Sequence, residues 1–264
     1  MIIDLTGFKA VISGSTAGIG RACAEGLLAA GASVVINGRG HDRVNAALYE
    51  LKQQFPDAAI AGVAADLATA EGAAAVFAQA PDADILVNNV GSATPKPFLE
   101  LTDADWLGIF QLNVMSAVRM TRQYLPAMVA RGWGRVVFMS SESALNIPKE
   151  MIDYGMTKTA MLAISRGVAE SVAGSGVTVN AVLPGPTRSE ILGNWMKAAS
   201  ESQGISQADA ELQFLKEMRP TSLIGRFATT EEVANLVVYV CSKQASATTG
   251  AALRVDGGVT RNVA

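Results

Sequence analysis

The sequence predicts an α/β fold: a single domain over residues 1–264, with a doubly wound, mostly parallel sheet of seven strands and helices on both faces. Seven short apolar runs are continuous rather than alternating in polarity, as in strands that are covered on both faces. The segments between these runs are long enough for crossover helices. This alternation is typical of repeated βαβ units and therefore of a parallel sheet.

The seven apolar runs mark the expected strands. In chain order they are Ala10–Ser13, Val34–Asn37, Ile60–Ala64, Ile85–Val87, Val136–Met139, Val177–Leu183 and Ala252–Val255. Helices are expected between them. We expect Asp103 to cap a long helix that ends near Arg131. We expect Asp153 to cap a helix over Tyr154–Val172, because a carboxylate at that position accepts N–H groups of the first turn.

Residues 186–225 form a longer connection than is usual between a strand and the next element. A connection of this length is typical of a lid over a functional site, and we expect a substrate lid here. A pair of helices packed on the surface, at a contact between subunits, fits the same residues equally well.

Composition excludes several classes of protein. The formal net charge is -3 and there is no basic cluster, so no nucleic-acid partner is expected. Cys23, Cys241 and the single histidine, His41, have no metal-ligand spacing, so no metal site is expected. The N-terminus does not resemble a signal peptide, and no apolar run is long enough to span a bilayer. We therefore expect a cytoplasmic protein without a membrane partner.

A glycine-rich turn follows the first strand and is the first candidate site. Gly14, Gly18 and Gly20 lie between a predicted strand and a predicted helix. Glycine lets the backbone approach a ligand closely, and the N-terminus of a helix suits a pyrophosphate. The spacing alone also fits a plain tight turn. Its place between the first strand and the first helix favours a dinucleotide site, and so a Rossmann-type sheet.

The end of the second strand indicates which dinucleotide is bound. An acidic residue there would accept hydrogen bonds from the adenosine ribose and repel a 2′-phosphate. The sequence instead has Asn37, Gly38 and Arg39, so it offers a guanidinium and no carboxylate. Because arginine pairs with phosphate in bidentate fashion, NADP is favoured over NAD.

Tyr154 and Lys158 are the second candidate site. They lie four residues apart on a predicted helix and therefore share a face. A nearby ammonium lowers the pKa of a phenol, so the pair suits acid/base chemistry on a hydroxyl or carbonyl oxygen. A surface pair explains most instances of this spacing. Ser140 and Ser141 strengthen the functional interpretation, because they end a strand at the edge where ligands bind in parallel sheets.

Taken together, these motifs resemble the short-chain dehydrogenase/reductase family over nearly the whole chain. The resemblance is to the single-domain type with an Asn-Ser-Tyr-Lys tetrad, similar to 3-oxoacyl-(acyl-carrier-protein) reductases. It implies that Asn113, Ser141, Tyr154 and Lys158 are catalytic. Ser141, rather than Ser140, lies at the family's usual interval before Tyr154.

The resemblance also assigns a larger set of residues to the cofactor. These are Gly14, Ser15, Thr16, Ala17, Gly18, Ile19, Gly20, Arg39, Asp66, Leu67, Asn89, Gly91, Tyr154, Lys158, Pro184, Gly185, Thr187 and Ser189. Two positions depart from the family pattern. Ser13 replaces a threonine at the start of the glycine turn, and Val90 replaces the alanine that usually precedes Gly91.

The implied activity is that of an NAD(P)-dependent oxidoreductase, which moves a hydride between a nicotinamide and an alcohol or ketone carbon. Tyr154 would exchange a proton with the substrate oxygen, which Ser141 would hold. Lys158 would lower the pKa of the tyrosine and bind the nicotinamide ribose. Asn113 would order a water in a proton relay. By the same resemblance a homo-oligomer is expected, either a tetramer or a dimer.

The substrate stays open among several readings. A carbonyl reductase or alcohol dehydrogenase is favoured, and residues 146–151 with Met156, mostly apolar, are expected to line its substrate side and to suit a hydrophobic, uncharged ketone. A 3-oxoacyl thioester reductase would instead need basic residues for the carrier's phosphate, for which Arg188, Lys197 and Arg219 are candidates. A non-catalytic dinucleotide sensor keeps the fold but tends to lose the tyrosine or the lysine. A nucleotide-sugar epimerase would need a further C-terminal domain.

Overall fold

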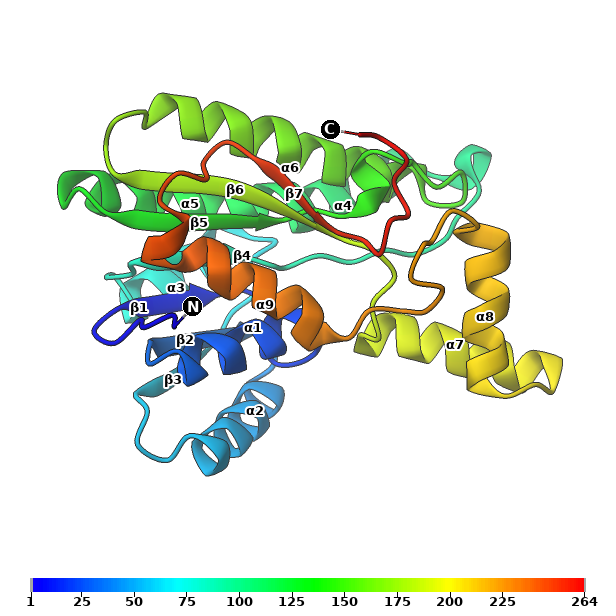
Figure 1. Cartoon of the computed structure of the whole chain (residues 1–264), viewed down its shortest axis with the longest axis horizontal. Coiled ribbons are helices and arrows are strands. Elements are labelled where there is room, and N and C mark those ends of the chain that lie inside the picture. The colour runs from blue at the N-terminus through cyan, green and yellow to red at the C-terminus, as the bar shows by residue number, and fades with distance from the viewer. Residues whose placement is uncertain (1, 264) are drawn as a thin grey trace.

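The parallel sheet occupies the middle of the molecule, with helices above and below it in a computed structural model that describes residues 2–263 (Figure 1). Its strand order is β3-β2-β1-β4-β5-β6-β7, and every neighbouring pair runs parallel. The strands are β1 Lys9–Ile12, β2 Ser33–Gly38, β3 Ile60–Ala64, β4 Ile85–Asn88, β5 Gly134–Met139, β6 Val177–Pro184 and β7 Ala252–Val255. The predicted fold class is confirmed, and the sheet is parallel throughout the described residues.

Successive residues of a strand point to opposite faces, so each strand contributes to two cores. In β1, Ala10 and Ile12 pack into one core and Val11 into the other. One face is covered by α1 Gly18–Ala29, α2 His41–Gln54 and α9 Thr230–Cys241, and the other by α3 Ala70–Gln79, α5 Ser116–Ala130 and α6 Ile152–Ser171 (Figure 1). Covering both faces removes the strands from water, which explains their continuous apolar runs.

The long helix expected from Asp103 is interrupted. It consists of α4 Asp103–Phe110, a π-helical turn at Gln111–Met115, and α5. Thr102 caps α4: its hydroxyl accepts the N–H of Asp105, whose carboxylate accepts the N–H of Thr102 in return. Asp103 was therefore the wrong cap, because the hydroxyl one residue earlier already satisfies the first turn.

The cap predicted for α6 was also wrong. The helix begins at Ile152, and the residue before it, Met151, makes no capping hydrogen bond. Asp153 is buried inside the first turn, where its carboxylate accepts the N–H of Tyr154 at 2.8 Å. The aspartate thus satisfies an N–H group of the first turn, but it does so as the second residue of the helix and not as its N-cap.

The segment 186–225 contains two helices, α7 Glu190–Gln203 and α8 Gln207–Met218, which stand beside the main body (Figure 1). They pack on each other around Met196, Leu215 and Phe227, in a small apolar cluster separate from the two cores of the sheet. Short 3₁₀ turns lie at Phe98–Glu100, Glu142–Ala144 and Lys243–Ala245. Among residues 2–263, no helix combines the length and apolar character needed to cross a bilayer.

Candidate active site

A cavity of about 750 Å³ lies where the strands end, and residues far apart in the sequence meet in its wall. Most of the predicted site residues line it: Gly14, Thr16, Ala17, Gly18, Ile19, Arg39, Asp66, Leu67, Asn89, Gly91, Ser141, Tyr154, Lys158, Pro184, Gly185, Thr187 and Ser189. Three predicted residues, Ser15, Gly20 and Asn113, lie outside the lining, and the contacts described below show what each of them does.

The glycine turn has the shape that a pyrophosphate requires. Gly14 and Gly18 have φ angles of 61° and 59°, in the left-handed region that favours glycine. A Cβ at Gly20 would lie 2.4 Å from both the carbonyl oxygen of Gly14 and Nδ2 of Asn89. Helix α1 follows with Ala17 as its N-cap and no side chain capping it. Its first N–H groups are therefore left for a ligand, and the turn fits a dinucleotide.

Two asparagines hold the glycine turn against the sheet. Oδ1 of Asn37 accepts the N–H of Gly14 at 3.3 Å, while its Nδ2 donates to the carbonyls of Val63 in β3 and Ala65 just after it. Nδ2 of Asn89 donates to the Gly14 carbonyl at 2.9 Å. Ser15 turns inward, and its hydroxyl donates to the carbonyl of Ile12 at 2.7 Å. Asn37 therefore supports the turn from within the cavity wall, and Ser15 supports it from behind the wall.

Two guanidiniums, rather than one, lie at the end of the cavity next to β2. Arg39 lines the cavity as predicted, and so does Arg43 from the first turn of α2. Arg43 also forms an ion pair of 2.6 Å with Glu190, the first residue of α7. Sequence reasoning missed Arg43, although a second arginine four residues after Arg39 was a usable signal. The cavity thus offers two cations where a 2′-phosphate would lie.

The two consecutive serines have different surroundings. The hydroxyl of Ser140 donates to the backbone carbonyl of Lys158 at 2.7 Å and so joins β5 to α6. Ser141 begins the turn Glu142–Ala144, and its hydroxyl makes a hydrogen bond with the Tyr154 phenol. Nζ of Lys158 lies 5.5 Å from the centre of the Tyr154 ring and donates to the Met139 carbonyl at 2.9 Å. The structure therefore brings Ser141, Tyr154 and Lys158 together.

The pKa of Tyr154 moves in the direction opposite to the sequence-based expectation. Burial raises the pKa of its phenol above the ordinary value, although the hydrogen bond with Ser141 lowers it. Burial also lowers the pKa of Lys158 to about 8. The charge of the nearby Lys158 ammonium does not offset the loss of solvation of the phenol. At pH 7, Tyr154 is a neutral phenol that can donate a proton.

Asn113 lies in the π-helical turn, behind the cavity wall. Its Oδ1 accepts the N–H of Ser92 at 2.9 Å, and its Nδ2 donates to the Ser92 carbonyl and to the Thr157 hydroxyl, both at 3.0 Å. A Cβ at Gly91 would lie 3.1 Å from Nζ of Lys158 and 3.5 Å from Oδ1 of Asn113. Asn113 and Lys158 therefore flank the same glycine, in a helical distortion that is often found at functional sites.

The expected lining of the substrate end was mostly wrong. Of residues 146–151 and Met156, only Met151 lines the cavity. Ile147 instead lies against Gly155, on the first turn of α6. The lining at this end mixes polar and apolar side chains: Ser92, Glu142, Ser143, Met151, Leu192, Asn194, Trp195, Phe214 and Arg219. The prediction failed because the turn after Ser141 directs the chain away from the cavity and the 186–225 segment replaces it.

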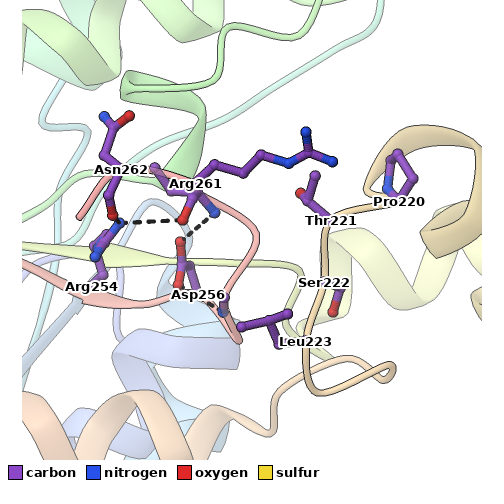
Figure 2. A pocket seen from close by; sticks show the side chains of 10 residues that line it. Pro220, Thr221, Ser222, Leu223, Arg254, Asp256, Arg261 and Asn262 are labelled. Atoms are coloured by element: carbon purple, nitrogen blue, oxygen red, sulfur yellow. Dashed lines mark hydrogen bonds between the residues drawn. The ribbon is translucent and has the colours of Figure 1, made fainter.

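A second cavity, of about 840 Å³, lies between Pro220–Leu223 and the residues that follow β7 (Figure 2). None of the predicted site residues lines it. The carboxylate of Asp256 accepts the N–H groups of Gly258 and Thr260 and so holds this part of the chain in place. The predicted chemistry therefore belongs to the first cavity alone.

Comparisons with known proteins agree with the fold and with the predicted reaction class. A family model described as "Enoyl-(Acyl carrier protein) reductase" matches residues 14–260. The chain is 43% identical over 263 residues to the "Uncharacterized oxidoreductase YvaG" of Bacillus subtilis (strain 168), covering 100% of both chains. It is 34% identical to the 3-oxoacyl-[acyl-carrier-protein] reductase FabG of Aquifex aeolicus (strain VF5), covering 98% of this chain and 100% of that one. The chain belongs to the short-chain dehydrogenase/reductase family.

Among solved structures, L-sorbose reductase from Gluconobacter frateurii, complexed with NADPH and L-sorbose, superposes with a TM-score of 0.94. It is 34% identical, and the match covers 100% of both chains. The predicted reaction class is thereby confirmed: this short-chain dehydrogenase/reductase is an NAD(P)-dependent oxidoreductase acting on an alcohol or carbonyl group.

The lowered pKa of Lys158 predicts a pH-dependent contribution to stability. Between about pH 8 and its ordinary pKa of 10.5, the folded protein releases the Lys158 proton and the unfolded chain keeps it. The unfolded state then binds more protons, so the free energy of unfolding rises with pH across this window, by about 3 kcal/mol. Wild type therefore gains stability relative to Lys158→Met as the pH rises from 8 to 10.5.

Urea denaturation at a series of pH values measures this difference. Subtracting the variant cancels the titration of the other groups, including the two buried cysteines. Lys52→Met, on the exposed side of α2, is the matched control and leaves the pH slope unchanged. A constant difference between wild type and Lys158→Met across the window would show that Lys158 keeps its ordinary pKa.

Proposed function

We propose that this protein is an NADP-dependent reductase or dehydrogenase in which Asn113, Ser141, Tyr154 and Lys158 carry the reaction on a small ketone or secondary alcohol. One observation carries the proposal: a phenol kept neutral by burial shares a hydrogen bond with Ser141 in the wall of a cavity that also contains the glycine turn. A neutral phenol beside a hydroxyl is suited to hold and protonate a carbonyl oxygen.

Each of the four residues has a distinct task in this proposal. Bound NADPH supplies the hydride. Ser141 donates a hydrogen bond to the substrate oxygen, and Tyr154 gives that oxygen its proton. Lys158 uses one N–H on the Met139 carbonyl, so two are left for hydroxyls of the cofactor's ribose. Asn113 supports Lys158 from behind Gly91 and holds the π-helical turn in place for a proton relay through water.

The remaining predicted residues would bind the cofactor. We assign the pyrophosphate to the glycine turn and α1, the adenine to Asp66 and Leu67, and the nicotinamide to the backbone of Pro184–Thr187 with Ser189. Gly20 acts by allowing the turn to close. Arg39 and Arg43 line the cavity at the end of β2, and Arg43 also pairs with Glu190 of α7. Because β2 itself ends in Asn37 and Gly38 rather than in a carboxylate, NADP is favoured over NAD. The relative that binds NADPH over the same fold supports this choice.

A ketone that carries hydroxyl groups is the substrate class that the cavity favours. Its substrate end contains serine, asparagine and glutamate side chains beside Trp195 and Phe214, so hydroxyl and apolar groups both find partners. The similar L-sorbose reductase acts on such a compound. The apolar ketone expected from the sequence rested on residues 146–151, which mostly lie elsewhere.

A 3-oxoacyl thioester is the second candidate, favoured by the relative that reduces it. Two of the three basic residues offered for its carrier are already paired. Arg188 binds Glu211 at 2.9 Å, and Arg219 binds Glu142 at 2.7 Å. Within the described residues this leaves Lys197 without an ion pair, which is a weaker phosphate site than three converging cations.

Three broader features belong to the same proposal. The segment 186–225 acts as a lid, because its residues line the cavity from Pro186 to Arg219. The chain forms a homo-oligomer, since Leu99 before α4 and Leu107 within α4 are 94% and 65% exposed and would be covered by a second copy.

The compartment of the protein is the cytoplasm, where two unpaired, buried cysteines are stable.

Tyr154→Phe tests the proton donor. Loss of the phenol should lower kcat by roughly 10²–10⁴-fold and leave the Kd for NADPH nearly unchanged, because only the proton transfer is removed. Nicotinamide absorbance follows turnover, and nicotinamide fluorescence follows binding. Tyr124→Phe is the matched control, because its hydroxyl lies outside the cavity on the Ala80 carbonyl. It should lower stability slightly and leave kcat intact.

The assay is run with NADPH and NADH on hydroxyketones, alkyl ketones and 3-oxoacyl thioesters. Preferred turnover of thioesters would replace the proposed substrate class. Absence of turnover, together with tight NADPH binding, would identify a dinucleotide sensor. Retention of most activity by Tyr154→Phe would remove the assigned role of Tyr154.

Arg39→Ala and Arg43→Ala test the choice of cofactor. Each variant loses a charged hydrogen bond to the 2′-phosphate, so the Kd for NADPH should rise roughly 10–100-fold while the Kd for NADH stays constant. Arg166→Ala, on the exposed surface of α6, serves as the control for net charge. An equal rise in the Kd for NADPH and for NADH would show that neither arginine binds the 2′-phosphate.

A further inference from the structure

Glu142 and Arg219 form the most deeply buried ion pair of the described residues. Nε of Arg219 lies 2.7 Å from Oε1 of Glu142, and the two side chains are only 6% and 3% exposed. All other ion pairs between described residues involve more exposed side chains. Both members of the pair also line the cavity of the proposed active site.

Stability does not explain this pair well. Removing two charges from water costs several kcal/mol per ion, and apolar side chains in the same volume are often as stable. The pair is also incompletely satisfied, because Oε2 of Glu142 is buried and has no hydrogen-bond partner. A buried pair with an unsatisfied oxygen beside reacting groups indicates a contribution to the reaction rather than to folding alone.

The pair connects the 186–225 segment to the body of the molecule. Arg219 directly follows α8, and α7 and α8 pack on each other around Met196, Leu215 and Phe227 rather than on the two main cores. The helices therefore have little apolar attachment to the sheet. A charged contact at the end of α8 fixes where they sit over the cavity.

The chain after Arg219 is tied to the residues that follow β7. The hydroxyl of Thr221 donates to the Val259 carbonyl at 2.5 Å, and the N–H of Leu223 donates to the Gly257 carbonyl at 2.8 Å. Figure 2 shows Thr221 and Leu223 beside the Asp256 segment. These bonds hold the connection outside the cavity, so Arg219 is its innermost anchor.

The other member of the pair is directly linked to the proposed catalytic hydroxyls. The Ser143 hydroxyl donates to Oε1 of Glu142 at 3.1 Å, and the Ser143 N–H donates to the Ser141 hydroxyl, also at 3.1 Å. Ser141 in turn shares a hydrogen bond with Tyr154. A continuous set of polar contacts therefore runs from the end of α8 to the proton donor.

We propose that Arg219 and Glu142 are positioning residues, which hold the α8 end of the 186–225 segment against the turn at Glu142–Ala144 and thereby orient the Ser141 hydroxyl toward the substrate oxygen. The inference rests on the proposed roles of Ser141 and Tyr154. Neither Arg219 nor Glu142 takes part in proton or hydride transfer. Their effect reaches the reaction through Ser141 and through closure of the cavity.

The pair also acts on Tyr154 by its charges. The charged groups around the phenol are Lys158 on α6, Glu142 on the turn and Arg219 after α8, with Asp256 behind Glu142. The Glu142 carboxylate raises the pKa of Tyr154, and the Arg219 guanidinium lowers it. Removing one partner alone therefore shifts the pKa of Tyr154 in a direction set by the charge that remains. The pKa rises when only Glu142 remains and falls when only Arg219 remains.

The test compares Arg219→Met, Glu142→Gln and the double variant Glu142→Met/Arg219→Met. Arg219→Met leaves a bare buried carboxylate, so Tm should fall, and kcat/KM for the ketone should fall roughly 100-fold through misplacement of Ser141. The double variant should recover Tm because no charge is left unpaired, yet keep the low kcat/KM. The Kd for NADPH should change by less than about threefold in each, since the glycine turn is untouched.

Arg226→Met is the matched control. It removes an exposed ion pair with Glu232 shortly after the lid and should leave kcat/KM unchanged. Recovery of both Tm and kcat/KM in the double variant would reduce the pair to a structural contact and overturn the proposal. Should the double variant fail to fold, Glu142→Gln, which keeps the shape of the side chain, gives the same decision from its kcat/KM.

Two further readouts separate this inference from the proposed function. Reduction needs protonated Tyr154, so activity falls as the pH rises through its pKa. That alkaline limb should move to higher pH in Arg219→Met and to lower pH in Glu142→Gln. Hydrogen exchange should accelerate in α8 of Arg219→Met, and this measurement needs no turnover.

If the wild type turns over the ketone and the variants keep its kcat/KM and its exchange in α8, the inference is overturned and the proposed function stays intact. No wild-type turnover, together with faster exchange in α8 of Arg219→Met, would reject the proposed function and keep the anchoring of the lid. Unchanged exchange in α8 would reject the anchoring whatever the activity.

Discussion

Every residue assigned to the reaction depends on one constraint of the fold: seven parallel strands end at the same edge of the sheet. The glycine turn follows β1, Arg39 follows β2, Gly91 follows β4 and Ser141 follows β5. Helix α6 then runs back along the sheet and presents Tyr154 and Lys158 to the same edge. If any one of these strands ran antiparallel, the loop that follows it would lie at the opposite edge of the sheet, and its residues would be missing from the site.

Burial at that edge acts on the two central side chains in opposite directions. It raises the pKa of Tyr154 and lowers the pKa of Lys158 to about 8, because loss of water disfavours the charged form of each. The phenol thereby stays protonated at neutral pH, and the Lys158 ammonium donates a hydrogen bond to the Met139 carbonyl. The Glu142–Arg219 pair adds two opposite charges to the same wall, and their balance at Tyr154 depends on both being present.

The parts that the sequence predicted are those with a local signal. Continuous apolar runs located the strands to within one or two residues, since burial on both faces leaves that pattern in each strand separately. The glycine turn and the Tyr154–Lys158 spacing were readable for the same reason. The predicted caps lie one residue after Thr102 and two residues after Met151, because Thr102 supplies the capping hydroxyl of α4 and α6 begins without a capping side chain.

The missed residues are those whose role arises from tertiary contacts. Glu142 was not predicted, and Arg219 was considered only as a site for a carrier's phosphate. The two residues lie far apart in the chain, and neither residue alone indicates a buried ion pair. Arg43 reaches the cavity only because α2 begins beside the end of β2. Of residues 146–151 only Met151 lines the cavity, and the segment 186–225, whose two helices pack around Phe227, supplies much of the lining instead.

A crystal structure with bound NADP and a hydroxyketone would show which groups hold the substrate oxygen. We expect the Tyr154 and Ser141 hydroxyls both to lie within about 2.6–3.2 Å of the substrate's carbonyl oxygen, with the reacting carbon facing the nicotinamide. A complex in which the carbonyl oxygen contacts other groups, and Tyr154 points away from the nicotinamide, would contradict this expectation.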